Sequence, residues 1–100
     1  MLQVLVALAD GEKHGYAIIK EVDRRTGGTV RLRAATLYTV LKRFVADGLI
    51  AETDHRPDPA LDDERRRYYR LTPHGRAVAL ADARRLQQTV AHARAKLGAL

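Results

Sequence analysis

The sequence predicts a small, mostly α-helical fold with one β-hairpin and a long last helix. Three observations lead to this prediction. Residues 35–50 (ATLYTVLKRFVADGLI) have the spacing of an amphipathic helix that runs into a short strand. Residues 65–76 (RRRYYRLTPHGR) have the pattern of a returning strand that leads into another helix, and apolar residues then repeat every three or four positions. A helix with a small polar and basic face beside an arginine-rich hairpin is typical of a winged helix-turn-helix.

Two further helices are expected before this motif. Apolar residues at the spacing of one helix face predict a helix over residues 1–10, which Asp10-Gly11 ends: Leu2, Leu5, Val6 and Ala9. Residues 15–26 predict a second helix whose core stripe is Ile18, Ile19 and Val22. Gly27-Gly28 ends it, because glycine readily adopts the left-handed conformation of a helix cap. Residues 30–32 are expected to form an extended bridge or a small strand.

The third helix is predicted to have two different sides. One apolar stripe faces the core and consists of Leu37, Val40, Leu41 and Phe44. The opposite side carries small residues with one aromatic ring, one hydroxyl and one cation, namely Ala35, Tyr38, Thr39, Lys42 and Ala46. Such a side can approach a groove closely, and Thr39 and Lys42 are the candidates for touching base edges. The alternative is an ordinary solvated face, with Tyr38 as a half-buried surface aromatic.

Residues 49–55 and 66–71 predict the two antiparallel strands of the hairpin. Pro57 and Pro59 fall in the connecting loop, where no backbone donor is needed. Alternation from a buried Leu71 turns Tyr69 inward and leaves three side chains outward: Arg66, Tyr68 and Arg70. Thr72-Pro73 predicts a helix start, with the hydroxyl as cap and proline in the first turn.

The last helix carries a heptad-like apolar seam, which predicts an interface between two copies of the chain. Its members are Ala79, Ala83, Leu86, Val90, Ala93, Leu97 and Leu100. A helix of about 25 residues is about 37 Å long and overhangs a body this small. We therefore expect a homodimer, with a winged helix-turn-helix domain over residues 1–72 and a dimerisation helix over residues 73–100. The alternative is that this helix folds back on the first helix of its own chain.

Composition limits the classes of function. The 100 residues fit one small domain, and 18 Lys and Arg against 12 Asp and Glu give a net charge of +6, which favours an anionic partner. The chain has no cysteine, no apolar run of membrane-spanning length and no signal-peptide pattern, so we expect a cytoplasmic protein without membrane contact. Acidic residues crowd the hairpin loop, where they would repel DNA and where Arg65, Arg66 and Arg67 could simply neutralise them.

No catalytic constellation is recognisable. The four histidines, His14, His55, His74 and His92, are far apart and lack a spaced carboxylate or cysteine partner, so no metal site and no cofactor are expected. His14-Gly15 is interpreted as a helix start. The sequence also lacks a glycine-rich phosphate loop, an activated serine motif and a pair of catalytic carboxylates, so we do not expect an enzyme.

In order and spacing, three segments together resemble the PadR family of winged-helix transcriptional regulators. They are ALADGEKHGYAIIKEV at residues 7–22, ATLYTVLKRFVADGLI at residues 35–50 and RRRYYRLTPHGR at residues 65–76. The resemblance implies a dimeric repressor of a near-palindromic double-stranded DNA operator. It also implies a small-molecule effector of unknown identity.

The resemblance further implies which residues meet DNA. Tyr16 and Tyr38 would face the backbone, the wing would supply Arg66, Arg67 and Tyr68, and the groove-facing helix would supply Thr36, Thr39, Lys42 and Arg43. Where the family usually has a Ser-Pro-Gly style run, this chain has Arg33-Ala34-Ala35, which removes a helix cap but offers Arg33 to a phosphate. The near balance of 13 cations and 11 acids over residues 1–72 keeps a rival open, a winged helix that binds protein instead of DNA.

Overall fold

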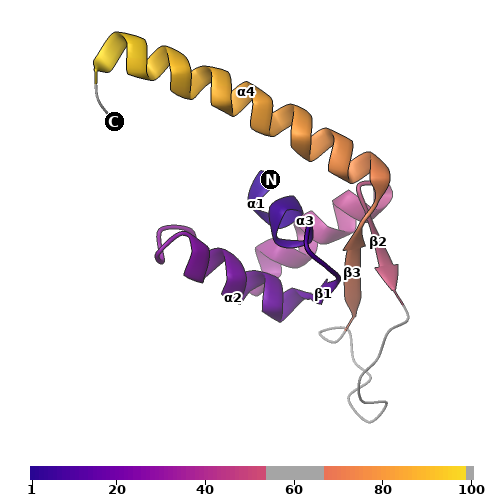
Figure 1. Cartoon of the computed structure of the whole chain (residues 1–100). Helices are drawn as coiled ribbons and strands as arrows, with labels where there is room; N and C mark the ends of the chain where they lie inside the picture. Colours follow the sequence, from indigo (N-terminus) through magenta and orange to yellow (C-terminus); the bar gives the residue numbers. More distant parts are fainter. Residues whose placement is uncertain (54–66, 99–100) are drawn as a thin grey trace.

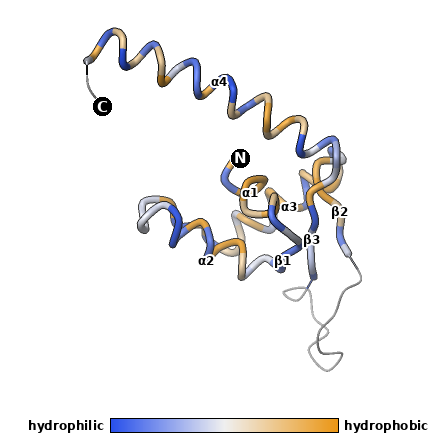
Figure 2. The backbone as a smooth tube through the Cα atoms, viewed as in Figure 1, coloured by the Kyte–Doolittle hydropathy of each residue, from blue (hydrophilic) through white to orange (hydrophobic). Residues whose placement is uncertain are grey.

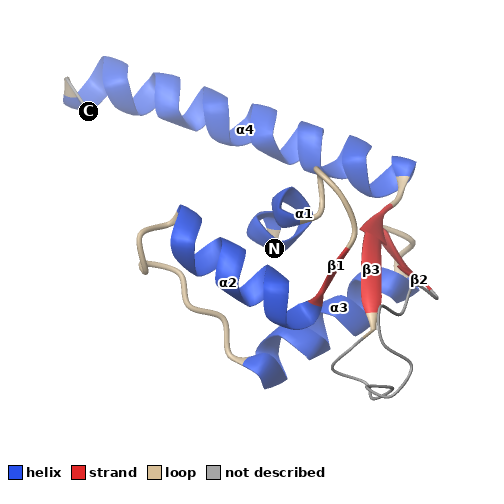
Figure 3. Cartoon of the chain, turned by 60° about the horizontal axis from the view of Figure 1, so that its bottom comes forward, coloured by secondary structure: helices blue, strands red, loops and turns tan. Residues whose placement is uncertain are grey.

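The computed structural model describes residues 1–53 and 67–98, which form a winged helix-turn-helix with a long last helix (Figure 1). The predicted fold class is therefore confirmed. The elements in chain order are α1 (Leu2–Ala7), β1 (Lys13–His14), α2 (Gly15–Arg25), α3 (Ala34–Ala46), β2 (Ile50–Thr53), β3 (Tyr68–Leu71) and α4 (Pro73–Leu97). Helices α1, α2 and α3 pack together beside a small sheet, and α4 crosses over α1 (Figure 3).

The core lies between the first three helices and the sheet. It is built from Val4, Leu5, Ala7, Leu8, Ile18, Val22, Leu37, Leu41, Phe44, Ile50 and Tyr69. The predicted core stripe of α3 is confirmed, because Leu37 and Leu41 are fully buried, Phe44 is only 8% exposed, and Val40 is partly buried against the core. The inward direction of Tyr69 is confirmed as well. Tyr69 is buried while Arg70 is exposed, as the two-residue period of a strand requires.

The sheet contains a strand that the sequence analysis missed. Its order is β1-β3-β2 with antiparallel neighbours, so β3 is central and pairs with both others. β1 has two residues, too few to show an alternating pattern, and it exists because Lys13 and His14 pair with Tyr69 and Tyr68. The strand considered for residues 30–32 is absent. There the Val30 N–H donates to Thr26 Oγ1 at 3.1 Å.

Two predicted elements are shorter in the structure. α1 ends at Ala7 instead of residue 10, because the next two N–H groups bond three residues back, to Leu5 and Val6. The hairpin strands cover 50–53 and 68–71, narrower than the predicted 49–55 and 66–71. Residues 54, 55 and 66 of those predictions lie outside the described residues.

Side chains cap the starts of α2 and α4. The Ala17 N–H donates to His14 Nδ1 at 3.1 Å, which confirms that His14-Gly15 marks a helix start. At α4 the predicted cap is confirmed, since the Gly75 N–H donates to Thr72 Oγ1 at 2.9 Å and Pro73 is the first helical residue. The Thr72 hydroxyl also lies 2.6 Å from the Gly48 carbonyl oxygen, which ties the start of α4 to the turn before β2.

The first turns of α4 belong to the compact body, and the remainder extends past it. Arg76 Nη2 donates to the Ala9 carbonyl oxygen at 3.0 Å, and Ala79 packs against the core. Apolar and polar residues alternate along the whole helix (Figure 2), and past these turns its apolar side chains are exposed. Leu86, Val90 and Leu97 are 53%, 43% and 76% exposed. The alternative that this helix folds back on the first helix holds for its first turns, and the dimer stays a prediction. It packs on α1 at its start and leaves most of its seam uncovered in this chain.

Across the described ranges 1–53 and 67–98, no helix combines the length and the apolar character that crossing a membrane requires.

Gly75 is where α4 crosses the turn before β2, and it admits no side chain. A Cβ on Gly75 would lie 1.9 Å from the Leu49 carbonyl oxygen, a backbone atom that cannot swing away. Gly75→Ala should therefore lower the free energy of unfolding by about 3 kcal/mol or more. Urea unfolding followed by circular dichroism measures it. The control Ala77→Gly, at an exposed position of the same helix, should cost only about 1 kcal/mol. Equal losses in the two variants would contradict this account.

The His14 cap makes a second stability prediction. His14→Ala leaves the Ala17 N–H without its side-chain acceptor and should destabilise the protein by about 1 kcal/mol. His14→Asn keeps an acceptor at the cap position and should regain most of that loss. Thermal unfolding of the two variants beside the wild type checks the difference. An alanine variant that melts like the wild type would show that the cap contributes nothing.

Candidate nucleic-acid interface

The outer face of α3 is polar, basic and open to solvent. Thr36, Thr39, Lys42 and Arg43 are all exposed, and the small Ala35 and Ala46 lie among them. This orientation follows from the burial of Leu37, Leu41 and Phe44, because side chains leave a helix about 100° apart and the opposite arc must face outward. The predicted groove-facing residues of α3 are thus available at the surface.

Few acids neutralise this face. Within the residues that the structure describes, Lys42 and Arg33 make no ion pair. Arg43 Nε lies 3.9 Å from Asp47 Oδ2, and Arg31 Nε lies 3.9 Å from Asp23 Oδ1. Pairs this exposed and this long hold their charges weakly, so the cations remain available to an anion. Arg33 occupies the cap position of α3, and its side chain makes no capping hydrogen bond. The replacement of a Ser-Pro-Gly style run by Arg33-Ala34-Ala35 predicted this loss of the cap.

The hydroxyl proton of Thr39 is used in a hydrogen bond within α3. Its hydroxyl donates to the Ala35 carbonyl oxygen at 3.0 Å, so the oxygen offers only acceptor lone pairs to a base edge. A donor on a base, such as an amino group in the major groove, fits this geometry.

Tyr38 lies at the edge of the α3 face instead of at its centre. It is half-buried and packs against the core, so the placement of Tyr38 on the open side needs correction. The ring rests on the first residue of α2, because an added Cβ at Gly15 would lie 2.8 Å from the Tyr38 hydroxyl oxygen. Tyr38 therefore joins α3 to α2 and also borders the exposed face.

Three tyrosines that were predicted to contact DNA lie around the start of α2, namely Tyr16, Tyr38 and Tyr68. The rings of His14 and Tyr16 are stacked with centroids 6.5 Å apart, and the rings of His14 and Tyr68 of β3 are nearly perpendicular with centroids 5.4 Å apart. Tyr38 lies against the glycine between His14 and Tyr16. We call His14, Tyr16, Tyr38 and Tyr68 the aromatic cluster. It links the wing to both helices of the helix-turn-helix.

His14 is the member of this cluster that the sequence analysis did not select. Its role depends on the pairing of β1 with β3, which places it opposite Tyr68. Tyr16 is 57% exposed, and the Lys20 ammonium lies 4.8 Å from the centroid of its ring. In the sequence, the one local indication of a role for His14 was the His-Gly-Tyr run at residues 14–16, directly before an apolar helix. A tyrosine with a cation over its ring presents both an apolar face and a charge at the surface.

The wing contributes less free charge than expected. Arg67 Nη1 bonds to Glu52 Oε1 of β2 at 3.3 Å, so its charge is balanced across the hairpin. The sequence predicted a phosphate contact for Arg67, with neutralisation by the acids of the hairpin loop as the alternative. Arg66 lies outside the described residues. Arg70, which was not among the predicted contacts, is exposed on β3 opposite Ala51.

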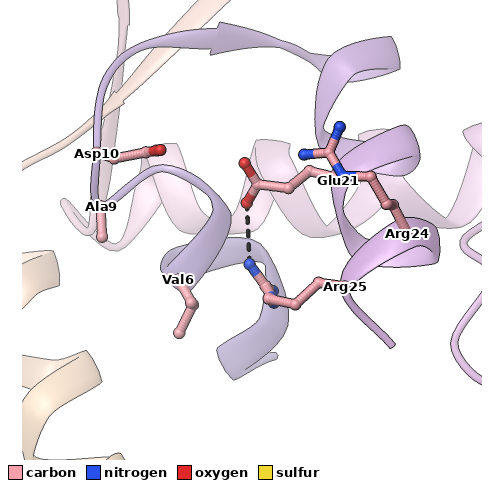
Figure 4. A pocket seen from close by; sticks show the side chains of 6 residues that line it. All are labelled: Val6, Ala9, Asp10, Glu21, Arg24 and Arg25. Carbon is pink, nitrogen blue, oxygen red and sulfur yellow. Dashed lines mark hydrogen bonds and ion pairs between the residues drawn. The ribbon is translucent and has the colours of Figure 1, made fainter. Parts of the chain in front are cut away.

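A separate shallow groove of about 530 Å³ lies between α1 and α2 (Figure 4). Its lining consists of Val6, Ala9, Asp10, Glu21, Arg24 and Arg25. Arg25 Nη1 donates to Glu21 Oε2 at 2.9 Å, and Lys13 pairs with both Glu21 and Asp10. The hydrogen bond from Lys13 lowers the pKa of the Asp10 carboxyl below its ordinary value. The link between α1 and α2 is Arg25 Nη2, which donates to the Gln3 carbonyl oxygen at 3.2 Å and to Gln3 Oε1 at 2.8 Å, so the charged groups of this groove serve to hold the two helices together.

No three His, Asp or Glu side chains of the described residues gather where they would hold a metal ion.

Comparison with known proteins assigns a family to this arrangement. The sequence model of the transcriptional regulator PadR-like family matches residues 4–81. The transcriptional regulator Rv3488 of Mycobacterium tuberculosis is 37% identical over 87 residues, which are 87% of this chain and 75% of that protein.

Solved structures agree on the fold. A PadR family regulator from Clostridium difficile superposes with a TM-score of 0.79 at 24% identity, covering 97% of this chain and 96% of that one. Bacillus subtilis PadR, solved in complex with operator DNA, has a TM-score of 0.69 at 22% identity, covering 80% of this chain and 42% of that one. With the family match spanning most of the chain, the conclusion is direct: this chain belongs to the PadR-like family of transcriptional regulators and is not an enzyme.

Proposed function

We propose that the chain is a homodimeric repressor that reads a near-palindromic operator in double-stranded DNA. α3 enters the major groove through Thr36, Thr39 and Lys42, while Arg33, Arg43, Tyr16 and Tyr38 meet the backbone beside it. The wing, with Arg66, Arg67 and Tyr68, lies along the adjacent backbone. A small apolar effector acting at the dimer interface completes the proposal and rests on the family resemblance alone.

The observation that carries this proposal is the two-sided burial of α3. Leu37 and Leu41 are fully buried, whereas Lys42 and Thr39 are exposed one residue and two residues away. A major groove about 12 Å wide admits a helix, and small residues such as Ala35 and Ala46 let it approach. The operator complex of Bacillus subtilis PadR supports DNA as the ligand of the shared fold.

The exposed seam of α4 supports the dimer. Leu86, Val90 and Leu97 present an apolar stripe that the described part of the chain leaves uncovered, and a second copy of the same stripe is the simplest cover. For operator binding, the two-fold axis of the pair has to present both copies of α3 to the same side of the duplex. Separated by about 34 Å, they would enter successive major grooves and require a near-palindromic operator.

Removing the cation of α3 tests the DNA interface. Lys42→Ala should weaken binding of the duplex upstream of the protein's own gene about tenfold, and should lower the slope of log affinity against log salt by up to about 0.9, because one cation fewer displaces counterions from the duplex. Fluorescence anisotropy over a salt series measures both. Lys96→Ala is the matched control, because it removes the same exposed charge from the far end of α4.

A flat salt response of the wild type, or equal affinities of the Lys42 and Lys96 variants, would contradict the proposed role of α3. Such a result favours the rival function, in which the winged helix binds a protein.

A charge in the α4 seam tests the dimer. Val90→Glu places a carboxylate in the predicted interface and should weaken the dimer at least about 100-fold, because a buried charge without a partner costs about 3–5 kcal/mol. Sedimentation velocity at micromolar concentration measures the assembly. Gln88→Glu adds the same charge on the opposite, exposed side of the helix and should leave the dimer intact. A wild-type protein that sediments as a monomer would refute the interface.

A further inference from the structure

The start of α2 contains a contact that the proposed DNA interface does not by itself require. Gly15 is buried and is the first residue of α2. The Tyr38 ring of α3 lies so close that a Cβ on Gly15 would meet the hydroxyl oxygen at 2.8 Å, Cζ at 3.0 Å and Cε1 at 3.1 Å. The bare backbone of Gly15 and the ring of Tyr38 thus join the two helices of the helix-turn-helix.

Backbone geometry does not explain the glycine. The glycines with positive φ among the described residues are Gly11, Gly27, Gly28, Gly48 and Gly98. Gly15 is not one of them, so its conformation is open to alanine. Glycine is also a poorer helix former than alanine. The close approach of the ring is therefore the physical reason for a residue without a side chain.

Rings on both sides show what the contact would control. His14 and Tyr16 flank Gly15 in the chain, and the ring centroids of His14 and Tyr68 of the wing are 5.4 Å apart. Tyr38 borders the exposed face that carries Lys42 on the next turn of α3. A shift of the Tyr38 ring would therefore move a side chain that borders both the start of α2 and the exposed face of α3.

We propose that Gly15 is a positioning residue for DNA recognition, a seat that holds the Tyr38 ring so that its hydroxyl meets the DNA backbone. This inference rests on the proposed function. A Cβ at Gly15 displaces the ring from 2.8 Å to at least the 3.4 Å of ordinary contact. Tyr38 is half-buried and the closest atoms are at the far end of its side chain, so the ring yields and the fold survives. Gly15→Ala should therefore weaken DNA binding while the protein still folds.

A double-mutant cycle tests the seat. Gly15→Ala, Tyr38→Ala and the double variant are compared with the wild type for binding to the duplex that the wild type protects in footprinting. Each single change should weaken binding about tenfold, the size expected for a lost hydrogen bond to a phosphate. The double variant should bind no more weakly than either single one, because alanine at position 15 has no ring left to displace.

Unfolding of the same four proteins provides a readout that needs no DNA. Gly15→Ala should lower or leave unchanged the midpoint of thermal unfolding in the wild type, because the gain in helix propensity is offset by the displaced ring. In the Tyr38→Ala background the same change should raise the midpoint of thermal unfolding, because only the gain in helix propensity remains. A change of sign between backgrounds is the signature of a direct contact.

Two further variants narrow the interpretation. Tyr38→Phe keeps the ring on the seat and removes the hydroxyl, so it should fold like the wild type and bind about tenfold more weakly. Ala77→Gly, at an exposed position of α4, changes helix propensity by a similar amount without displacing a ring and should bind like the wild type.

Wild-type affinity in the Gly15→Ala variant, or losses that multiply in the double variant, would overturn the proposal. A wild-type protein that protects no duplex would refute the proposed function, and the unfolding cycle would then decide the seat alone. In that case, a Gly15→Ala change that stabilises both backgrounds equally would overturn it.

Discussion

Burial of one side of α3 is the interaction on which the rest of the structure depends. Leu37, Leu41 and Phe44 fill the core beside Ile18 and Val22 of α2. The helix begins without a side-chain cap, so packing of its apolar side supplies most of its stability. The same packing sets the rotation of α3 about its axis. A polar face that appears in the sequence as a mixture of small and basic residues thereby becomes one open surface.

Two glycines control how closely the other elements approach, and their neighbours differ in kind. Gly75 lies against a backbone carbonyl at the crossing of α4 over the turn before β2, so its lack of a side chain serves folding. Gly15 lies against the end of the half-buried Tyr38 side chain, which can move, so its proposed effect is on the position of that ring. A single type of residue can thus serve the core at one site and the surface at another.

α4 connects stability with assembly. Its first turns complete the body through Thr72, Gly75, Arg76 and Ala79, whereas the described residues leave Leu86, Val90 and Leu97 of its seam exposed. A domain of about 100 residues buries a modest fraction of its surface, so covering that seam with a second copy would add apolar burial that the body cannot supply alone. The same pairing would set the distance between the two α3 helices, so stability and operator geometry would share one interface.

The sequence by itself determined the features that depend on local periodicity and capping. These include the buried stripe of α3, the inward turn of Tyr69 and the Thr72 cap with Pro73, because each needs only neighbours within a few residues. Tertiary structure alone decided the pairing of β1 with β3, the meeting of His14 with Tyr68, the half-burial of Tyr38 on Gly15 and the Arg67–Glu52 ion pair. These contacts join residues 15 to 56 positions apart in the chain, and the pattern around any one residue carries no record of which distant surface will meet it.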